Sequence, residues 1–99
     1  MAYRRYEIKP LVVNFKTVSL VVIDEHVDKH SEHIDDLLIL KIVDDLDNQN
    51  FLPVQEKDSF QYFTSKIKTN GKWYKLVWLL EKDLCYIGII TVFRDRRIK

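Results

Sequence analysis

The dipeptide Asn70-Gly71 separates two apolar-patterned runs, residues 60–68 and 73–80. A two-residue type I′ turn needs positive φ at both central positions, so Asn-Gly between such runs is the strongest short-range signal for a β-hairpin. Residues 84–93 follow the short turn 81–83 and are almost continuously apolar, which is typical of a strand buried on both faces. Gly88 inside this run indicates a bulge or a close backbone approach. The second half of the chain is therefore predicted to be a β-meander with residues 84–93 as its central strand.

The first half of the chain is predicted to supply one strand and two helices. Residues 11–24 are rich in β-branched side chains and follow Pro10, so they form one strand or a bent pair. Asp24 can cap a short helix over residues 25–30, and Ser31 can cap a second over residues 32–47. The expected fold is one α+β domain over residues 1–99, of order β-α-α-β-β-β, with two helices packed on one face of a mainly antiparallel twisted sheet.

The second predicted helix carries a core stripe and two leucines outside it. The stripe follows the i, i+3, i+4, i+7 spacing and consists of Ile39, Ile42, Val43 and Leu46, extended by Ile34 and Leu38. Leu37 and Leu40 fall on the other side of the helix. Either a neighbouring loop covers them, or they form a small patch for a partner or a dimer. Residues 47–58 then form a polar connection that Phe51 and Leu52 are expected to pin to the core.

Charge is segregated along the chain although its formal total is only +1. Residues 24–58 contain eleven acidic residues against three lysines, whereas residues 59–99 contain nine basic residues against three acidic ones. Such asymmetry points to a polyanionic partner. It predicts an acidic helical layer behind a basic sheet, an arrangement that suits a nucleic-acid binder.

Several classes of protein are excluded by what the sequence lacks. The single Cys85 allows neither an intrachain disulfide framework nor a cysteine-based zinc site. The two glycines form no phosphate-binding loop, and no cofactor motif occurs, so no cofactor is expected. There is no signal-peptide pattern and no apolar run near the ~20 residues of a membrane span, so we expect a cytoplasmic protein that does not contact membranes.

Three histidines, His26, His30 and His33, lie within eight residues of one another. His26 and His30 share a helix face if the first helix includes both. They could transfer protons near neutral pH or could simply hydrogen-bond at a helix junction. A metal pair is disfavoured, because no glutamate follows the first histidine as in the metalloprotease motif, and no metal is expected.

Basic and aromatic residues in the second half form two further signals. Arg94, Arg96 and Arg97 follow the last strand and either clamp a phosphate through bidentate hydrogen bonds or form a solvated basic tail. Seven aromatic residues lie along the meander: Phe60, Tyr62, Phe63, Trp73, Tyr74, Trp78 and Tyr86. They are interleaved with Lys66, Lys68, Lys72 and Lys75, as in sheets that stack bases and contact phosphates. Most of these rings must be core, and Tyr74 is the better candidate for an exposed one.

This order of elements resembles the RelE-like ribonuclease toxins and, more broadly, the barnase–colicin–RelE superfamily of small metal-independent ribonucleases. The resemblance covers roughly residues 16–97 and consists of an initial strand, two helices, the meander containing residues 73–78, and residues 87–93 leading into basic side chains. It has no diagnostic motif. It implies His26, His30, Tyr74, Arg94 and Arg96 as catalytic positions.

The predicted function is therefore a toxin-like domain that cleaves or binds RNA without a metal, with a cognate antitoxin or a second copy of the chain as candidate partners. Arg94 and Arg96 would neutralise the scissile phosphate, a histidine would transfer protons, and Lys72, Lys75 and Arg97 would bind the nucleic acid. The alternative is a non-catalytic interaction module, such as an immunity or antitoxin-like protein, a small viral or mobile-element protein or a homodimer, that uses Leu37 and Leu40.

Overall fold

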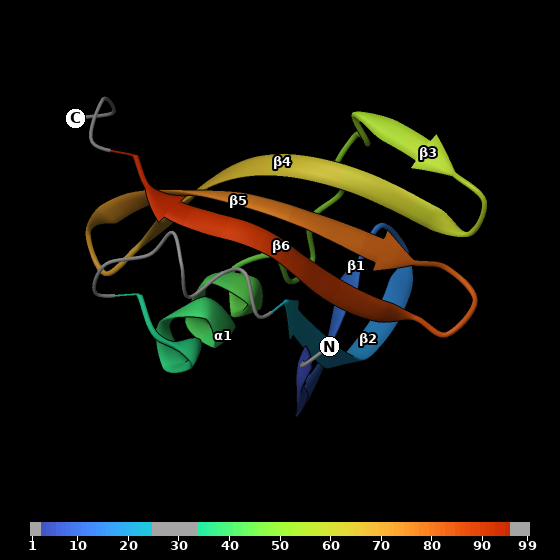
Figure 1. The fold of residues 1–99 in the computed structure, drawn as a ribbon, viewed down its shortest axis with the longest axis horizontal. Helices are drawn as coiled ribbons and strands as arrows, with labels where there is room; N and C mark the ends of the chain where they lie inside the picture. Colours follow the sequence, from blue (N-terminus) through green and yellow to red (C-terminus); the bar gives the residue numbers. More distant parts are fainter. Residues whose placement is uncertain (1–2, 25–33, 96–99) are drawn as a thin grey trace.

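A computed structural model describes residues 3–24 and 34–95, which form a six-stranded mixed sheet with one helix packed against it (Figure 1). The strands are β1 (Tyr3–Val13), β2 (Lys16–Asp24), β3 (Gln55–Lys57), β4 (Phe60–Thr69), β5 (Lys72–Glu81) and β6 (Tyr86–Arg94), and the helix is α1 (Asp36–Asp44). Their order across the sheet is β1-β2-β6-β5-β4-β3. β2 and β6 run parallel, and all other neighbouring strands are antiparallel.

The predicted order β-α-α-β-β-β with two helices is wrong. The described residues hold six strands and one helix of nine residues, while the helix expected over residues 25–30 lies outside them. The first strand begins at Tyr3, and a turn at Asn14-Phe15 divides this region into β1 and β2. Both turn residues have positive φ, 50° and 65°, as a type I′ turn requires. β3 adds a further strand within the expected loop.

β1 was missed because its composition is polar, although its exposure follows the period of a strand. From Tyr3 to Ile8 exposed and half-buried residues alternate, which is the period-two signature of an edge strand with one face on the protein. Pro10 is tolerated because β1 is at the edge, and the β1–β2 register shifts between Glu7 and Leu11 around it.

α1 begins later and ends earlier than predicted. Asp35 caps it, since the Asp35 Oδ1 accepts the Leu38 N–H at 2.9 Å, and the last helical residue is Asp44. The predicted core stripe is confirmed: Ile39, Ile42, Val43 and Leu46 are all fully buried. The Thr69 hydroxyl donates to Asp45 Oδ2 at 2.6 Å and fixes the end of α1 to β4. Within the part of the chain that the structure describes, no helix has the length and apolarity to cross a membrane.

The predicted meander is confirmed in its turn and in the order of its strands, while the neighbour of Gly88 is a side chain and not the predicted bulge or backbone. Asn70 and Gly71 have φ of 55° and 77°, so both central positions of the β4–β5 turn are left-handed. β6 lies between β2 and β5 and is the central strand that its apolar sequence predicts. A Cβ atom on Gly88 would lie 2.9 Å from Cγ and Cδ1 of Leu79, so a glycine is needed for this close approach.

The connection between α1 and β3 is held to the core by only one of the two residues that were predicted to hold it. The Phe51 ring packs edge-on against Trp78 at 5.5 Å and Phe63 at 6.5 Å between centroids, which confirms the prediction for Phe51. Its backbone is held by Asn14, whose Oδ1 accepts the Phe51 N–H at 2.6 Å. Leu52 is 92% exposed, so the prediction for Leu52 is wrong.

A carboxylate at the start of α1 joins the helix to the edge strand β1. Arg4 donates from Nε and Nη2 to the two Asp36 oxygens at 2.7 and 2.9 Å, and the Tyr6 hydroxyl also donates to Asp36. The Arg4 hydrogen bonds hold the pKa of Asp36 below its ordinary value of 3.8. The ion pair is partly buried, with side-chain exposures of 29% and 23%.

We therefore expect Asp36→Asn to destabilise the fold by about 1 kcal/mol at neutral pH, the upper end for a partly exposed pair. Because the folded pKa is depressed, this contribution is present above pH 3.8 and is lost as the pH falls through the folded value. Urea unfolding of the wild type and of Asp36→Asn at pH 7 and pH 3 measures this contribution to the free energy of unfolding. An unchanged difference between wild type and variant at the two pH values would contradict the assignment, and Asp44→Asn on the exposed side of α1 is the control.

Candidate functional site

The two faces of the sheet differ in what covers them. Strand alternation directs Phe63, Ile67 and Trp78 into the core shared with α1, where they are buried. The intervening side chains of β4 and β5 point to the other face, which we call the open face. Most of its described side chains are half-buried or exposed, and α1 lies on the opposite side (Figure 1).

Three lysines and two aromatic rings gather at one end of the open face, and we call them the basic patch. Lys66 of β4 pairs with Lys75 of β5, and Lys75 pairs with Phe93 of β6. The next pair of residues on the same face of the hairpin is Lys68 and Trp73. The Lys75 Nζ lies 5.9 Å from the centroid of the Phe93 ring, within the range of a cation–π contact.

The pairing inside the basic patch is unfavourable for the isolated sheet. Like charges on directly opposite residues destabilise a strand pair, and Lys66 is directly opposite Lys75. Towards the hollow their neighbours on the same face are Thr64, Val77 and Thr91, none of which is acidic. Beside Trp73 lies Asp95, a buried carboxylate whose backbone N–H donates to the Trp73 carbonyl at 2.9 Å. The arrangement therefore favours an anion that bridges the two ammonium groups.

The other end of the open face contains a hollow of about 520 Å³, which we call the aromatic hollow. One row of paired residues crosses it, from Arg5 through Val22, Gly88 and Leu79 to Tyr62. In the middle of the row the Leu79 side chain packs over Gly88, since a Cβ atom there would lie 2.9 Å from Leu79 Cγ and Cδ1. The residues that line the hollow are Tyr3, Arg5, Leu20, Val22, Asp24, Phe60, Tyr62, Leu79, Leu84, Tyr86, Gly88, Ile89 and Ile90.

Tyr86 is the titratable group most affected by the hollow. Burial raises its pKa above the ordinary value of 10.0, the Glu81 carboxylate raises it further, and the Arg5 guanidinium opposes both. The Tyr86 hydroxyl therefore stays protonated at neutral pH and can donate a hydrogen bond. Together with Arg5 it places donors at the edge of a mainly apolar hollow.

Charge follows the two layers only in part. The exposed carboxylates Asp35, Asp44 and Asp45 lie on or beside α1, whereas Lys66 and Lys68 are exposed on the open face. Lys41, Lys72 and Arg94 add positive charge on the α1 side, and Asp24 adds a carboxylate to the open face.

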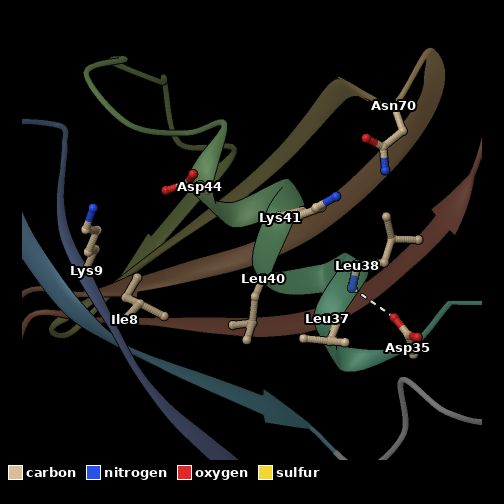
Figure 2. A pocket seen from close by; sticks show the side chains of 9 residues that line it. All are labelled: Ile8, Lys9, Asp35, Leu37, Leu38, Leu40, Lys41, Asp44 and Asn70. Atoms are coloured by element: carbon tan, nitrogen blue, oxygen red, sulfur yellow. Dashed lines mark hydrogen bonds between the residues drawn. The ribbon is translucent and has the colours of Figure 1, made fainter.

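A second depression, the α1 groove, lies beside the helix and has a volume of about 570 Å³. Figure 2 shows Leu37 and Leu40 projecting from α1 on the side where Ile8 of β1 lies. Leu37 is 75% exposed, and Leu40 is half-buried against the core. Lys9 and Lys41 line the same groove.

The residues predicted to be catalytic are only partly described. Tyr74 and Arg94 are directly opposite on β5 and β6, so the fold brings these two together on the α1 side of the sheet. Tyr74 is 5% exposed, which corrects the expectation of an exposed ring, because strand alternation directs it into the core. Arg94 is exposed. His26, His30 and Arg96 lie outside the described residues.

The predicted nucleic-acid contacts are divided between the faces. Lys75 belongs to the basic patch, whereas Lys72 pairs with the buried Thr69 and so lies on the α1 side of the hairpin tip. Arg97 lies outside the described residues. Lys66, Lys68 and Phe93 were not assigned to a site, although the period-two spacing of Thr64, Lys66 and Lys68 is a signal for one exposed face. Arg5 was missed because β1 was missed.

Residues 3–24 and 34–95 contain no group of three or more His, Cys, Asp or Glu side chains placed to hold a metal ion. No protein-family model, curated protein or solved structure matches this chain. Any function of the open face therefore rests on the chemistry of its own residues.

Proposed function

We propose that this chain binds RNA through the basic patch on the open face. The observation that carries the proposal is the pair Lys66 and Lys75, two lysines directly opposite each other on neighbouring strands of that face. A phosphate backbone relieves their repulsion and releases counterions as it binds. Trp73 and Phe93 supply ring faces beside the lysines, and bases stack on such rings.

The direct test is a fluorescence anisotropy titration with an unstructured single-stranded RNA at several salt concentrations. Three lysine–phosphate contacts predict that the logarithm of the association constant falls with the logarithm of salt at a slope of about −2. A slope near zero, or no binding at low salt, would remove the RNA-binding proposal.

RNA cleavage of the kind found in RelE-like toxins is proposed only as a consequence of this binding. Arg94 is exposed at the same end of the sheet as the basic patch, one residue beyond Phe93, but on the α1 side, so a bound strand would reach it by passing over the end of β6. Its guanidinium would neutralise the scissile phosphate. Incubation with total RNA in EDTA tests this step: cleavage that Arg94→Ala abolishes supports it, and intact RNA together with normal growth on expression leaves a binding protein.

The second candidate function is self-association through the α1 groove. It is favoured by the 75% exposure of Leu37, beside Leu40 and Ile8 in the same depression. We expect Leu37→Asp to shift a dimer to a monomer in size-exclusion chromatography with light scattering, because a buried carboxylate at an apolar interface is costly. Leu52→Asp, at a leucine that is 92% exposed and lies away from the groove, is the control. A wild-type monomer would dismiss this candidate.

A further inference from the structure

The aromatic hollow has the features of a ligand site. Its volume of about 520 Å³ falls within the range of small-molecule pockets, which are mainly apolar with a few polar groups at defined positions. Rings of Phe60, Tyr62 and Tyr86 border it, and its floor includes the Leu79 side chain, which packs over Gly88. A flat aromatic ligand fits a hollow of this composition.

The polar side chains that line the hollow restrict the chemical class of its ligand further. Arg5 and Asp24 line the side formed by β1 and β2, so the lining includes a guanidinium donor and a carboxylate. The Arg5 guanidinium can also stack on a ring face. A nucleobase combines two apolar faces with an edge of donors and acceptors, and it is therefore the aromatic group that this lining matches.

The hollow and the basic patch lie on one continuous face. Lys75 of the patch and Leu79 of the hollow are four residues apart on β5, which corresponds to roughly 13 Å along the strand. A single strand of a few nucleotides spans that distance, and sheet sites for single strands cover about 4–16 nucleotides.

We infer that the aromatic hollow takes one unpaired base of an RNA strand whose phosphates lie on the basic patch, so that the chain selects single-stranded over double-stranded RNA. This inference rests on the proposed RNA binding. Phosphate contacts supply affinity without regard to pairing, whereas the hollow can be filled only by a base that is free of a partner strand.

The test compares three fluorescein-labelled RNAs of about twelve nucleotides, a length within the range of such sites. They are an oligouridylate, a chain of equal charge without bases, and a duplex. We expect the oligouridylate to bind about tenfold more tightly than the abasic chain, because one stacked base contributes roughly that factor. The duplex should bind no better than the abasic chain.

Tyr62→Ala should remove this tenfold preference and leave the affinity for the abasic chain unchanged. Phe15→Ala, an exposed ring at the β1–β2 turn, should preserve the preference. Equal binding of oligouridylate and abasic chain by the wild type would overturn the inference while leaving the basic patch in place. No binding of any RNA would overturn both. The wild-type comparison decides the matter even if Tyr62→Ala fails to fold.

Discussion

Replacing Lys66, Lys68 and Lys75 together by alanine is expected to lower the affinity for single-stranded RNA about a hundredfold at about 0.1 M salt. For single strands, each lost phosphate contact makes the slope of log K against log[salt] shallower by about 0.7. Relative to 1 M salt, that change corresponds at 0.1 M to a loss of about 0.7 logarithmic units in the association constant. Three contacts therefore account for about two units. The slope itself should fall to near zero. Anisotropy titrations of wild type and variant at several salt concentrations measure both quantities.

The matched control removes the same net charge elsewhere. Lys9→Ala, Lys16→Ala and Lys41→Ala together lower the charge by three but lie outside the basic patch. If RNA were attracted only by net charge, this variant would lose as much affinity as the first. Equal losses would contradict the assignment of the patch, whereas a much smaller loss supports it. Folding of the patch variant is expected to be intact or improved, because the repulsion between Lys66 and Lys75 is removed.

Trp78→Ala is expected to cost about 3–5 kcal/mol of unfolding free energy. Trp78 is fully buried, stacks on Phe63 at 4.1 Å between centroids and meets Phe51 edge to face at 5.5 Å. The lost area and the cavity left among these rings both contribute to the cost. At about 4–8 °C per kcal/mol for a domain of this size, the midpoint should fall by more than about 12 °C. Thermal and urea unfolding followed by circular dichroism measure the change.

Two further variants separate the contributions to the Trp78 effect. Ser65→Ala removes the hydroxyl that accepts the Trp78 Nε1–H at 3.0 Å, and should cost about 1–3 kcal/mol because the indole N–H is left buried without an acceptor. Trp73→Ala removes a half-buried indole on the open face and should cost much less. A loss at Trp73 equal to that at Trp78 would contradict the layered arrangement of the core.

Where the sequence contains a strong local signal, the predicted fold is right. Asn70-Gly71 determines a turn by its own backbone preferences, and the stripe Ile39, Ile42 and Val43 determines which side of α1 faces the core. The turn and the helix stripe each depend only on residues that are close to one another in the chain. The N-terminal half lacks such a signal: Asn14-Phe15 is a type I′ turn with a phenylalanine at its second position, which composition does not suggest.

The residues that meet in the basic patch could not be predicted from the sequence, for a different reason. The alternation of Thr64, Lys66 and Lys68 places these residues on one face, but it does not say which side chains of the next strand lie opposite. Only the register of β4 with β5 pairs Lys66 with Lys75, and only the position of β6 adds Phe93. Tyr74 shows the converse: alternation separates it from Trp73 and Lys75, but only the packing of α1 against the sheet decides that its side is the buried one.

The sequence by itself determined the meander, the core side of the helix and the separation of acidic from basic residues, because each depends on neighbours in the chain. The tertiary structure decided that β2 lies parallel to β6, which joins Arg5 and Val22 to Gly88, Leu79 and Tyr62 in one row. That pairing joins segments more than sixty residues apart in the chain (Val22 and Gly88). No periodicity encodes a contact at such a separation, because it is selected by the burial of the whole core and not by the local backbone.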